Sequence, residues 1–322
     1  MKILKKISIF LAVCLLVLSS FSFIGIKKVS AADTDSNSQV QYTIGTTKNV
    51  PSAIAAMGKN LNSYSKSNLS ADVKAYDSTK DLNNAIESGT VNAAVTDLVN
   101  YAALSKKHSN WKIAGTMPGY YGLVANKKYK SVKKLKHKTI AVDKSNYSRF
   151  YLKKALKKNK LKLSNVKLKQ IDSEADRVSA LKDGSVDAAV LQDPSISEAK
   201  ANGDKVVNKD KIKADNGNVL IINNDYAKKN ASNTNILCTV INEQIRTINK
   251  SDSYMLTNNS FSEYDVSGKA VQKLNAMTVS FKKMHRVKKS DFKKAFKYAK
   301  QQKLYKGKIS YNKSTISVKG IK

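Results

Sequence analysis

The sequence predicts an α/β protein of two similar lobes, each a mostly parallel sheet flanked by helices, with a ligand cleft between them. The main observation is a repeat. LNNAIESGTVNAAVTD, at residues 82–97, recurs ninety-five residues later inside RVSALKDGSVDAAVLQDP, at residues 177–194. Each copy has the pattern of an amphipathic helix, a glycine suited to the left-handed helix end, and a short apolar strand.

Two further observations support this fold class. VKAYDS (73–78) and LKQIDS (168–173) share the same register, and TIG (43–45) matches TIA (139–141) with one inserted residue. Each half then alternates strand, helix, strand, helix, strand, which the handedness of crossovers arranges as a parallel sheet. Ligands of open parallel sheets bind at the carboxyl ends of strands, and these ends carry TTKN, TD, DKSNYS and QDP.

The elements of the first lobe follow in order. Residues 42–46 form the first strand, and Asn49-Val50-Pro51 opens a helix with proline in its first turn. After the first copy of the repeat, another strand covers 111–115. Proline and two glycines in residues 116–122 mark a sharp turn, where the chain is expected to cross to the second lobe.

The second lobe contains the strand TIAVD (139–143) and a helix from Tyr147 with an apolar face of Phe150, Tyr151, Ala155 and Leu156. The chain is expected to cross back near 216–223 and to add helices at 236–248 and 291–304. The predicted division is 42–119 with 219–322 for the first lobe and 120–218 for the second.

Residues 1–31 have the pattern of an export signal peptide, and 32–41 form a polar linker. Three lysines precede an uncharged run, and Val29-Ser30-Ala31 supplies the small residues of a cleavage site. An uncleaved membrane anchor is the alternative, because the run is long enough to span a bilayer. Leu11-Ala12-Val13-Cys14 only partly matches a lipid-attachment motif, so Cys14 is interpreted as an apolar residue of the signal. Cys238 then remains as the single mature cysteine, which excludes an internal disulfide and favours a buried core position.

The charge is large and unevenly placed. The formal net charge is +34, and residues 127–169 and 269–322 each contribute +16. Solvated helix faces, such as Lys153, Lys154, Lys157 and Lys158, are the simplest interpretation. Nucleic acid is not expected as a partner, because the chain reads as exported, has four arginines against fifty-four lysines and lacks a groove-reading motif. Anionic cell-wall polymers are the better partner for a secreted basic protein.

The sequence predicts no metal site, cofactor or catalytic centre. His108, His137 and His285 are scattered, and no metal, nucleophile or phosphate-loop motif occurs. Asp97 and Asp193, one from each lobe, invite interpretation as a catalytic carboxylate pair. Ligand hydrogen bonding or helix capping is the favoured interpretation of both.

These segments resemble the solute-binding proteins of ABC importers, in particular the nitrate, sulfonate and taurine group and its thiamine-precursor relatives. The resemblance covers nearly all of residues 40–310. It rests on four segments, YTIGTTKNVPSAIA (42–55), AIESGTVNAAVTD (85–97), LKHKTIAVDKSNYSRFYLKKAL (135–156) and ALKDGSVDAAVLQDP (180–194). It implies the two-lobed periplasmic-binding-protein fold of type II, with ligand held between lobes by strand-end loops, a helix N-terminus and an acidic residue beside a proline. Carried over by position, the implied ligand-binding residues are Thr46, Thr47, Asn49, Thr96, Asp97, Thr116, Tyr120, Ser145, Asn146, Tyr147 and Asp193.

The resemblance implies a non-enzymatic, monomeric protein, secreted or associated with the cell surface. It would deliver a small organic or anionic solute, such as a sulfonate, nitrate, taurine or a thiamine precursor, to the membrane subunits of an ABC permease. A basic adhesion protein that keeps this fold is the alternative, and an exported enzyme is a third class. The loop at 143–148 is the expected anion site, with Ser145 as the helix cap and the amides of the first helical turn facing the cleft.

Overall fold

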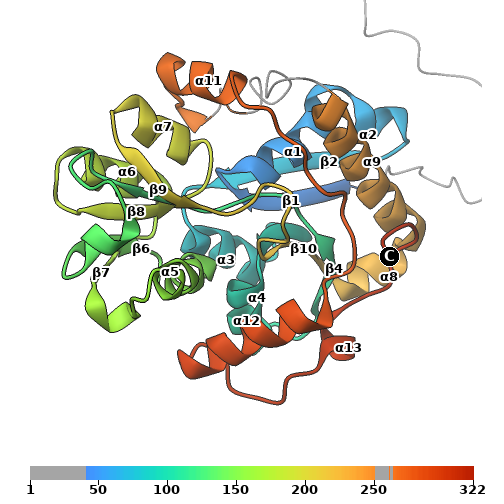
Figure 1. Cartoon of the computed structure of the whole chain (residues 1–322). Helices are drawn as coiled ribbons and strands as arrows, with labels where there is room; N and C mark the ends of the chain where they lie inside the picture. Colours follow the sequence, from blue (N-terminus) through green and yellow to red (C-terminus); the bar gives the residue numbers. More distant parts are fainter. Residues whose placement is uncertain (1–40, 251–260, 262–263) are drawn as a thin grey trace, which may run out of the picture. The chain divides into compact units, whose positions relative to one another are not determined.

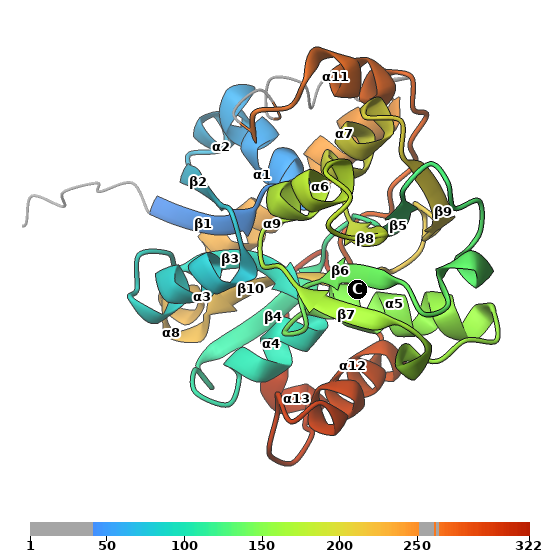
Figure 2. The same ribbon diagram turned by 90° about the vertical axis from the view of Figure 1, so that its left-hand side faces the viewer.

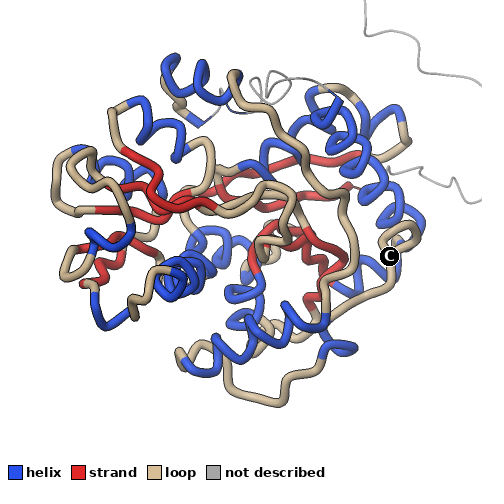
Figure 3. The backbone as a smooth tube through the Cα atoms, in the orientation of Figure 1, coloured by secondary structure: helices blue, strands red, loops and turns tan. Residues whose placement is uncertain are grey.

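The computed structural model of the protein describes residues 41–250, 261 and 264–322. The predicted signal peptide, Cys14 and all of the polar linker except its last residue lie outside the described residues. Two five-stranded sheets flanked by helices make up the described chain, which confirms the predicted fold class (Figures 1 and 3).

The first sheet has the strand order β2-β1-β3-β10-β4. Strands β1, β2 and β3 pair in parallel, and β10 is antiparallel to both of its neighbours. The strands are β1 (Gln41–Thr47), β2 (Ser70–Tyr76), β3 (Ala93–Asp97), β4 (Trp111–Thr116) and β10 (Asn218–Asn223), and the helices that connect the first four are α1 (Val50–Asn60), α2 (Ser63–Lys66), α3 (Thr79–Glu87) and α4 (Leu98–Leu104).

The second sheet repeats this plan with the order β7-β6-β8-β5-β9, and β5 is its antiparallel strand. The strands are β5 (Gly122–Ala125), β6 (Thr139–Val142), β7 (Lys167–Gln170), β8 (Ala188–Leu191) and β9 (Lys205–Lys209), and the helical segments are η1 (Val132–Leu135), α5 (Tyr147–Lys158), η2 (Leu163–Asn165), α6 (Glu174–Lys182) and α7 (Ser195–Ala201).

The antiparallel strand of each sheet follows directly after a crossing from the other half of the chain. β5 follows the turn at 117–121, and β10 follows the segment at 210–217. Each crossing strand sits fourth in its sheet, between the third and last strands of that half. On this basis we propose the lobe boundaries at 119–120 and 218–219.

The remaining helices are α8 (Asn224–Lys229), α9 (Ala231–Lys250), α11 (Gly268–Asn275), α12 (Lys289–Gln301) and α13 (Tyr311–Ser314). Helix α9 packs on α1, which follows the first strand. Helix α11, which the predicted division assigns to the first lobe, instead packs against α7 of the second. The amide of Ser267 donates a hydrogen bond of 3.0 Å to a carboxylate oxygen of Glu198. The repeat carries no signal for this contact, because α11 lies outside both copies.

Two sequence predictions about single side chains have different outcomes. Cys238 is fully buried in α9, as predicted, and burial raises the pKa of its thiol to about 12. Lys154, predicted to be solvated, is half-buried on α5 because its ammonium group lies over the rings of Tyr147 and Phe150. Among the described residues, no helix has the length and apolar character needed to cross a membrane.

Candidate functional site

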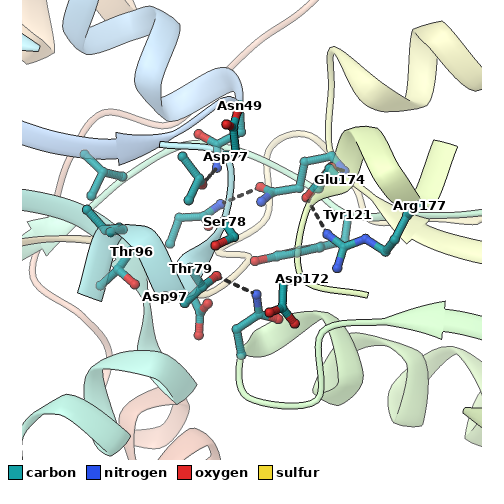
Figure 4. Close-up of a pocket in the computed structure, with 16 residues that line it drawn as sticks. Asn49, Asp77, Ser78, Thr79, Thr96, Asp97, Tyr121, Asp172, Glu174 and Arg177 are labelled. Atoms are coloured by element: carbon teal, nitrogen blue, oxygen red, sulfur yellow. Dashed lines mark hydrogen bonds and ion pairs between the residues drawn. The ribbon is translucent and has the colours of Figure 1, made fainter. Parts of the chain in front are cut away.

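A small polar cavity lies between the two sheets (Figure 4). Its volume is about 30 Å³, which holds one or two water molecules. A molecule larger than this does not fit in the cavity as it stands. The lining residues are Thr47, Asn49, Asp77, Ser78, Thr79, Leu82, Val95, Thr96, Asp97, Tyr121, Asn146, Asp172, Glu174, Arg177, Gln192 and Asn218.

Twelve of these residues form six pairs, with one member in or beside the first sheet and its helices and the other in or beside the second. Both members of a pair occupy matching places in the two copies of the fold. Two of the pairs follow the second strand of each half of the fold. One further pair lies at the ends of the third strands, and another lies at the starts of the crossing strands β10 and β5. The pairs are Asn49 and Asn146, Asp77 and Asp172, Thr79 and Glu174, Leu82 and Arg177, Asp97 and Gln192, and Asn218 and Tyr121.

Helix N-termini place many of these side chains. Asn49 caps α1 by accepting from the Ser52 amide at 3.2 Å, and Asn146 caps α5 by accepting from the Ser148 amide at 2.9 Å. A short polar side chain at this position satisfies a backbone N–H that the helix leaves free. The same requirement therefore fixes one asparagine on each side of the cavity.

Three hydrogen bonds cross the cavity from the first sheet and its helices to the second sheet and its helices. The Asn146 amide group donates to Thr79 Oγ1 at 2.9 Å, and that of Asn218 donates to Gln192 Oε1 at 3.5 Å. The Tyr147 backbone amide, in the first turn of α5, donates to the Asp97 carboxylate. In Figure 4, Thr79 and Asp97 lie on one side of the cavity, and Glu174 and Arg177 on the other.

Asp97 is 5% exposed and ends the third strand of the first lobe. Its Oδ1 caps α4 by accepting from the amides of Val99 at 2.8 Å and Asn100 at 2.9 Å. Burial raises the pKa of Asp97 to about 7, despite these backbone donors, and the charge of Asp143 adds to the rise. The carboxyl group therefore changes its charge near neutral pH.

The second lobe contributes a buried ion pair. Arg177 is 2% exposed, and its Nη2 lies 3.3 Å from Glu174 Oε1. Arg177 Nη1 donates to the Ile171 carbonyl at 3.1 Å, and the Gln192 amide donates to Glu174 Oε2 at 2.7 Å. Burial raises the pKa of Glu174, and the neighbouring guanidinium opposes the rise. Arg177 Nε is buried and has no hydrogen-bond partner among the described residues.

The structure brings five of the eleven predicted site residues to this cavity. They are Thr47, Asn49, Thr96, Asp97 and Asn146. Thr116 and Tyr147 line a separate cavity of about 170 Å³ between α5 and the start of α12. Thr46 is buried behind the first strand, where its hydroxyl bonds to Ser52 at 2.5 Å.

The predicted acidic corner lies in the core of the second lobe and not at the cavity. Tyr120 and Asp193 are each 1% exposed, and the tyrosine hydroxyl donates to the Asp193 carboxylate. Asp193 Oδ1 also accepts from the amide and hydroxyl of Ser197 in α7, so its oxygens are satisfied internally. Because Asp97 and Asp193 do not line the same cavity, the structure does not assemble them as a carboxylate pair.

The predicted anion loop needs a correction. The cap of α5 is Asn146, and Ser145 is an exposed residue whose amide and hydroxyl both bind Asp143 Oδ1, at 2.8 and 2.5 Å. The competing local hydrogen bonds of Asp143 shift the cap by one residue. The amides of Ser145, Tyr147 and Ser148 are thereby occupied by protein side chains.

Sequence reasoning missed most of the charged lining. Asp77 and Asp172 belong to the repeat, and both follow the second strand of their half, where a ligand-facing residue is expected. Arg177 opens the second copy of the repeat and is one of only four arginines in the chain. That rarity was the available signal for a special position.

No group of three or more histidine, cysteine, aspartate or glutamate side chains within the described residues is arranged to hold a metal ion. His108 and His285 each face one carboxylate, Glu87 at 3.4 Å and Asp215 at 2.8 Å.

Several solved structures have a fold similar to that of this chain over most of its length, although their sequence identity to it is low. A zinc-bound ligand-binding component of an ABC-type import system from Staphylococcus aureus has a TM-score of 0.74 and 16% identity, with 87% of this chain and 97% of that chain covered. The alkanesulfonate-binding protein SsuA from Xanthomonas axonopodis pv. citri, bound to MOPS, has a TM-score of 0.72 and 16% identity, with coverage of 87% and 99%. The desulfurization enzyme DSZB has a TM-score of 0.61 and 13% identity, with coverage of 86% and 96%.

Comparison of the sequence with curated proteins gives no match. The family model described as NMT1/THI5 like matches residues 49–248, which include fifteen of the sixteen residues that line the cavity, all except Thr47. This match covers more than half of the 322 residues and agrees with the resemblance inferred from the sequence. The chain therefore belongs to the NMT1/THI5-like family and has the two-lobed periplasmic-binding-protein fold.

Proposed function

We propose that this protein is an extracytoplasmic solute-binding protein of an ABC importer. It captures a small solute between its lobes and delivers it to the membrane subunits of a permease. The observation that carries the proposal is the paired lining of the cavity, because both lobes and both crossings contribute side chains to one polar space. Such a cavity opens and closes as the lobes move about the crossings.

The proposal includes export by the segment 1–31 and a monomeric protein at the cell surface. It includes no chemical conversion of the solute. The likeness to DSZB means that a fold of this kind also carries an enzyme. Binding without turnover is favoured here because the cavity contains one deeply buried carboxyl group, Asp97, already engaged in capping a helix.

A thermal-shift screen with small metabolites tests the proposal. A solute at about one hundred times its Kd adds about 2.7 kcal/mol to the free energy of unfolding. The matched variants are Thr79→Phe, which fills the cavity, and Thr239→Phe, on an exposed position of α9. We expect stabilisation of the wild type and of Thr239→Phe but not of Thr79→Phe. Stabilisation of all three proteins would place the solute elsewhere, and a screen without any stabilising solute would reject the function.

A basic surface favours a second candidate function, attachment to anionic cell-wall polymers. The two segments of highest charge meet where α5 contacts α12 (Figure 2). The rings of Phe150 and Tyr298 are 4.6 Å apart at this contact, and the Lys153 ammonium lies 5.3 Å from the Tyr298 ring. Exposed lysines on the two helices include Lys153, Lys157, Lys158, Lys293, Lys297 and Lys300.

Salt elution from immobilised teichoic acid tests this second candidate. Exposed charges are screened beyond about 10 Å at 0.1 M salt, so we expect retention at low salt and release at moderate salt. Lys153→Glu with Lys157→Glu should elute at clearly lower salt than the control pair Lys228→Glu with Lys229→Glu, which makes the same charge change on α8. Equal elution of the two variants would show that net charge alone, and not this surface, holds the polymer.

A further inference from the structure

The charge of the cavity is opposite to the charge of the chain. The sequence has 58 basic against 24 acidic residues. The cavity is nevertheless lined by four carboxyl groups, one guanidinium and no lysine. The acidic residues are Asp77, Asp97, Asp172 and Glu174, and the basic residue is Arg177.

The single cation of the cavity is already balanced. Arg177 faces Glu174 at 3.3 Å, so this pair contributes no net charge when both groups are ionised. The carboxyl groups of Asp77, Asp97 and Asp172 remain. Asp77 forms an ion pair of 2.6 Å with Lys48, but Lys48 does not itself line the cavity. The interior is thus left with an excess of negative charge.

Asp77 and Asp172 are the exposed members of this set, and they occupy matching positions in the two lobes. One carboxylate therefore stands on each side of the entrance. A sulfonate or nitrate that enters would meet the like charge of Asp172 on one side and the Asp77 carboxylate, paired with Lys48, on the other. Like charges repel each other, and they do so more strongly in a partly closed cleft than in open water.

The helix end that would attract an anion is occupied by the protein. The Asp97 carboxylate accepts from the Tyr147 amide at the start of α5. Asp143 and Asn146 accept from the amides of Ser145 and Ser148, at 2.8 and 2.9 Å. An anionic solute would have to displace a carboxylate that the helix already binds.

We infer that the solute carries a positively charged nitrogen, as an amine, amidine or quaternary ammonium group, and that the cavity rejects simple anions. The carboxylates of Asp97, Asp172 and Glu174 are the acceptors for this group. Arg177 Nε, buried without a hydrogen-bond partner among the described residues, is the donor available to an acceptor atom of the same solute. This inference rests on the proposed solute-binding function and names the chemical class of its ligand.

A screen sorted by charge tests the inference. Three sets are compared by thermal shift and calorimetry. They are organic cations such as choline, agmatine and aminopyrimidines, zwitterions such as amino acids and taurine, and anions such as ethanesulfonate, short carboxylates and nitrate. We expect binding within the first two sets and none in the third, with affinity that falls as salt rises. Binding confined to the anions would overturn the inference and leave the solute-binding function standing. Binding in none of the sets would reject that function, and the inference with it.

A variant that removes the charge of Asp172 tests whether the carboxylates at the entrance attract a cationic solute. Asp172→Asn removes one exposed carboxylate that lines the cavity, and Glu243→Gln removes one exposed carboxylate from α9 as a control. For the cation that binds best, we expect Asp172→Asn to weaken binding by about fivefold or more, because one unit of attraction near water is lost. Glu243→Gln should leave the Kd unchanged. Equal Kd values for both variants, or tighter binding by Asp172→Asn, would contradict the assignment.

Discussion

The two halves of this protein share a scaffold and differ in what the scaffold carries. Ser78 and Ser173 cap the equivalent helices α3 and α6, by accepting from the amides of Asp81 at 3.1 Å and Asp176 at 3.3 Å. Asp77 and Asp172 precede these caps. One and four residues after the caps, the first lobe has Thr79 and Leu82, whereas the second has Glu174 and Arg177.

This difference provides an internal control for the buried ion pair. A buried ion pair is often no more stabilising than well-packed apolar residues of similar volume. The first lobe places Leu82 where the second places Arg177, so the fold accepts an apolar residue at this position. The pair in the second lobe therefore needs a reason besides stability, and binding of a solute in the cavity supplies one.

The largest loss of stability is expected when only one member of the ion pair between Glu174 and Arg177 is replaced. Arg177→Leu leaves Glu174 without its cation, which should cost about 3–4 kcal/mol in the free energy of unfolding. The double variant Glu174→Thr with Arg177→Leu copies the first lobe and should recover most of that loss. Urea unfolding of the wild type, both single variants and the double variant measures the coupling. Additive losses would show that the two side chains act independently.

A smaller change in stability, one that depends on pH, is expected from Asp97. Gln192 occupies the equivalent position in the other half. Burial raises the pKa of Asp97 to about 7 in the folded protein. Its stabilising contribution is complete below the unfolded value of about 3.9 and is lost as pH rises through the folded value. The carboxyl group faces the charge of Asp143 and the amides of Val99, Asn100 and Tyr147.

We therefore expect the wild type to lose about 2–3 kcal/mol of stability, relative to Asp97→Asn, between pH 5 and pH 8. The asparagine variant keeps an oxygen that can cap α4 but does not titrate. Urea unfolding of both proteins across this range measures the difference. A constant difference between them would mean that Asp97 is ionised throughout.

The smallest loss of stability is expected from the serine helix caps that the two halves share. Ser78→Ala and Ser173→Ala each remove a helix cap, and each should cost about 1 kcal/mol. Ser78 should be the more sensitive of the two, since its hydroxyl also donates to the Asp81 carboxylate at 2.6 Å. Thermal unfolding of the two variants gives the comparison. A much larger cost at Ser173 would indicate that the two caps are not equivalent.

The repeat predicted the scaffold because backbone requirements repeat along the chain. Gly89 and Gly184 both adopt left-handed backbone, with φ of 73° and 80°, at the matching helix ends. Apolar strands and polar strand ends follow them in both copies. These are local features, so a single sequence is enough to place the sheets and to indicate that the cavity lies at the strand ends.

The composition of the cavity could not be predicted in the same way. Which strand-end side chains face the cavity depends on how the two sheets approach each other, and local periodicity does not encode that approach. Tyr120 and Asp193 satisfy each other inside the second lobe, while Asn146 replaces Ser145 as the cap of α5 because Asp143 binds the serine. Asp77 and Asp172, by contrast, are predictable from the sequence, because they occupy the same position in both copies of the repeat and follow the second strand of each half.

The central claim is that the charged residues of the second lobe turn a shared scaffold into a site for a cationic solute. Calorimetry of the double variant Glu174→Thr with Arg177→Leu, using the solute that binds best in the charge-sorted screen, tests it most directly. The account predicts at least a tenfold loss of affinity, equivalent to about 1.4 kcal/mol, with a melting temperature close to that of the wild type. Unchanged affinity in a folded double variant would contradict it.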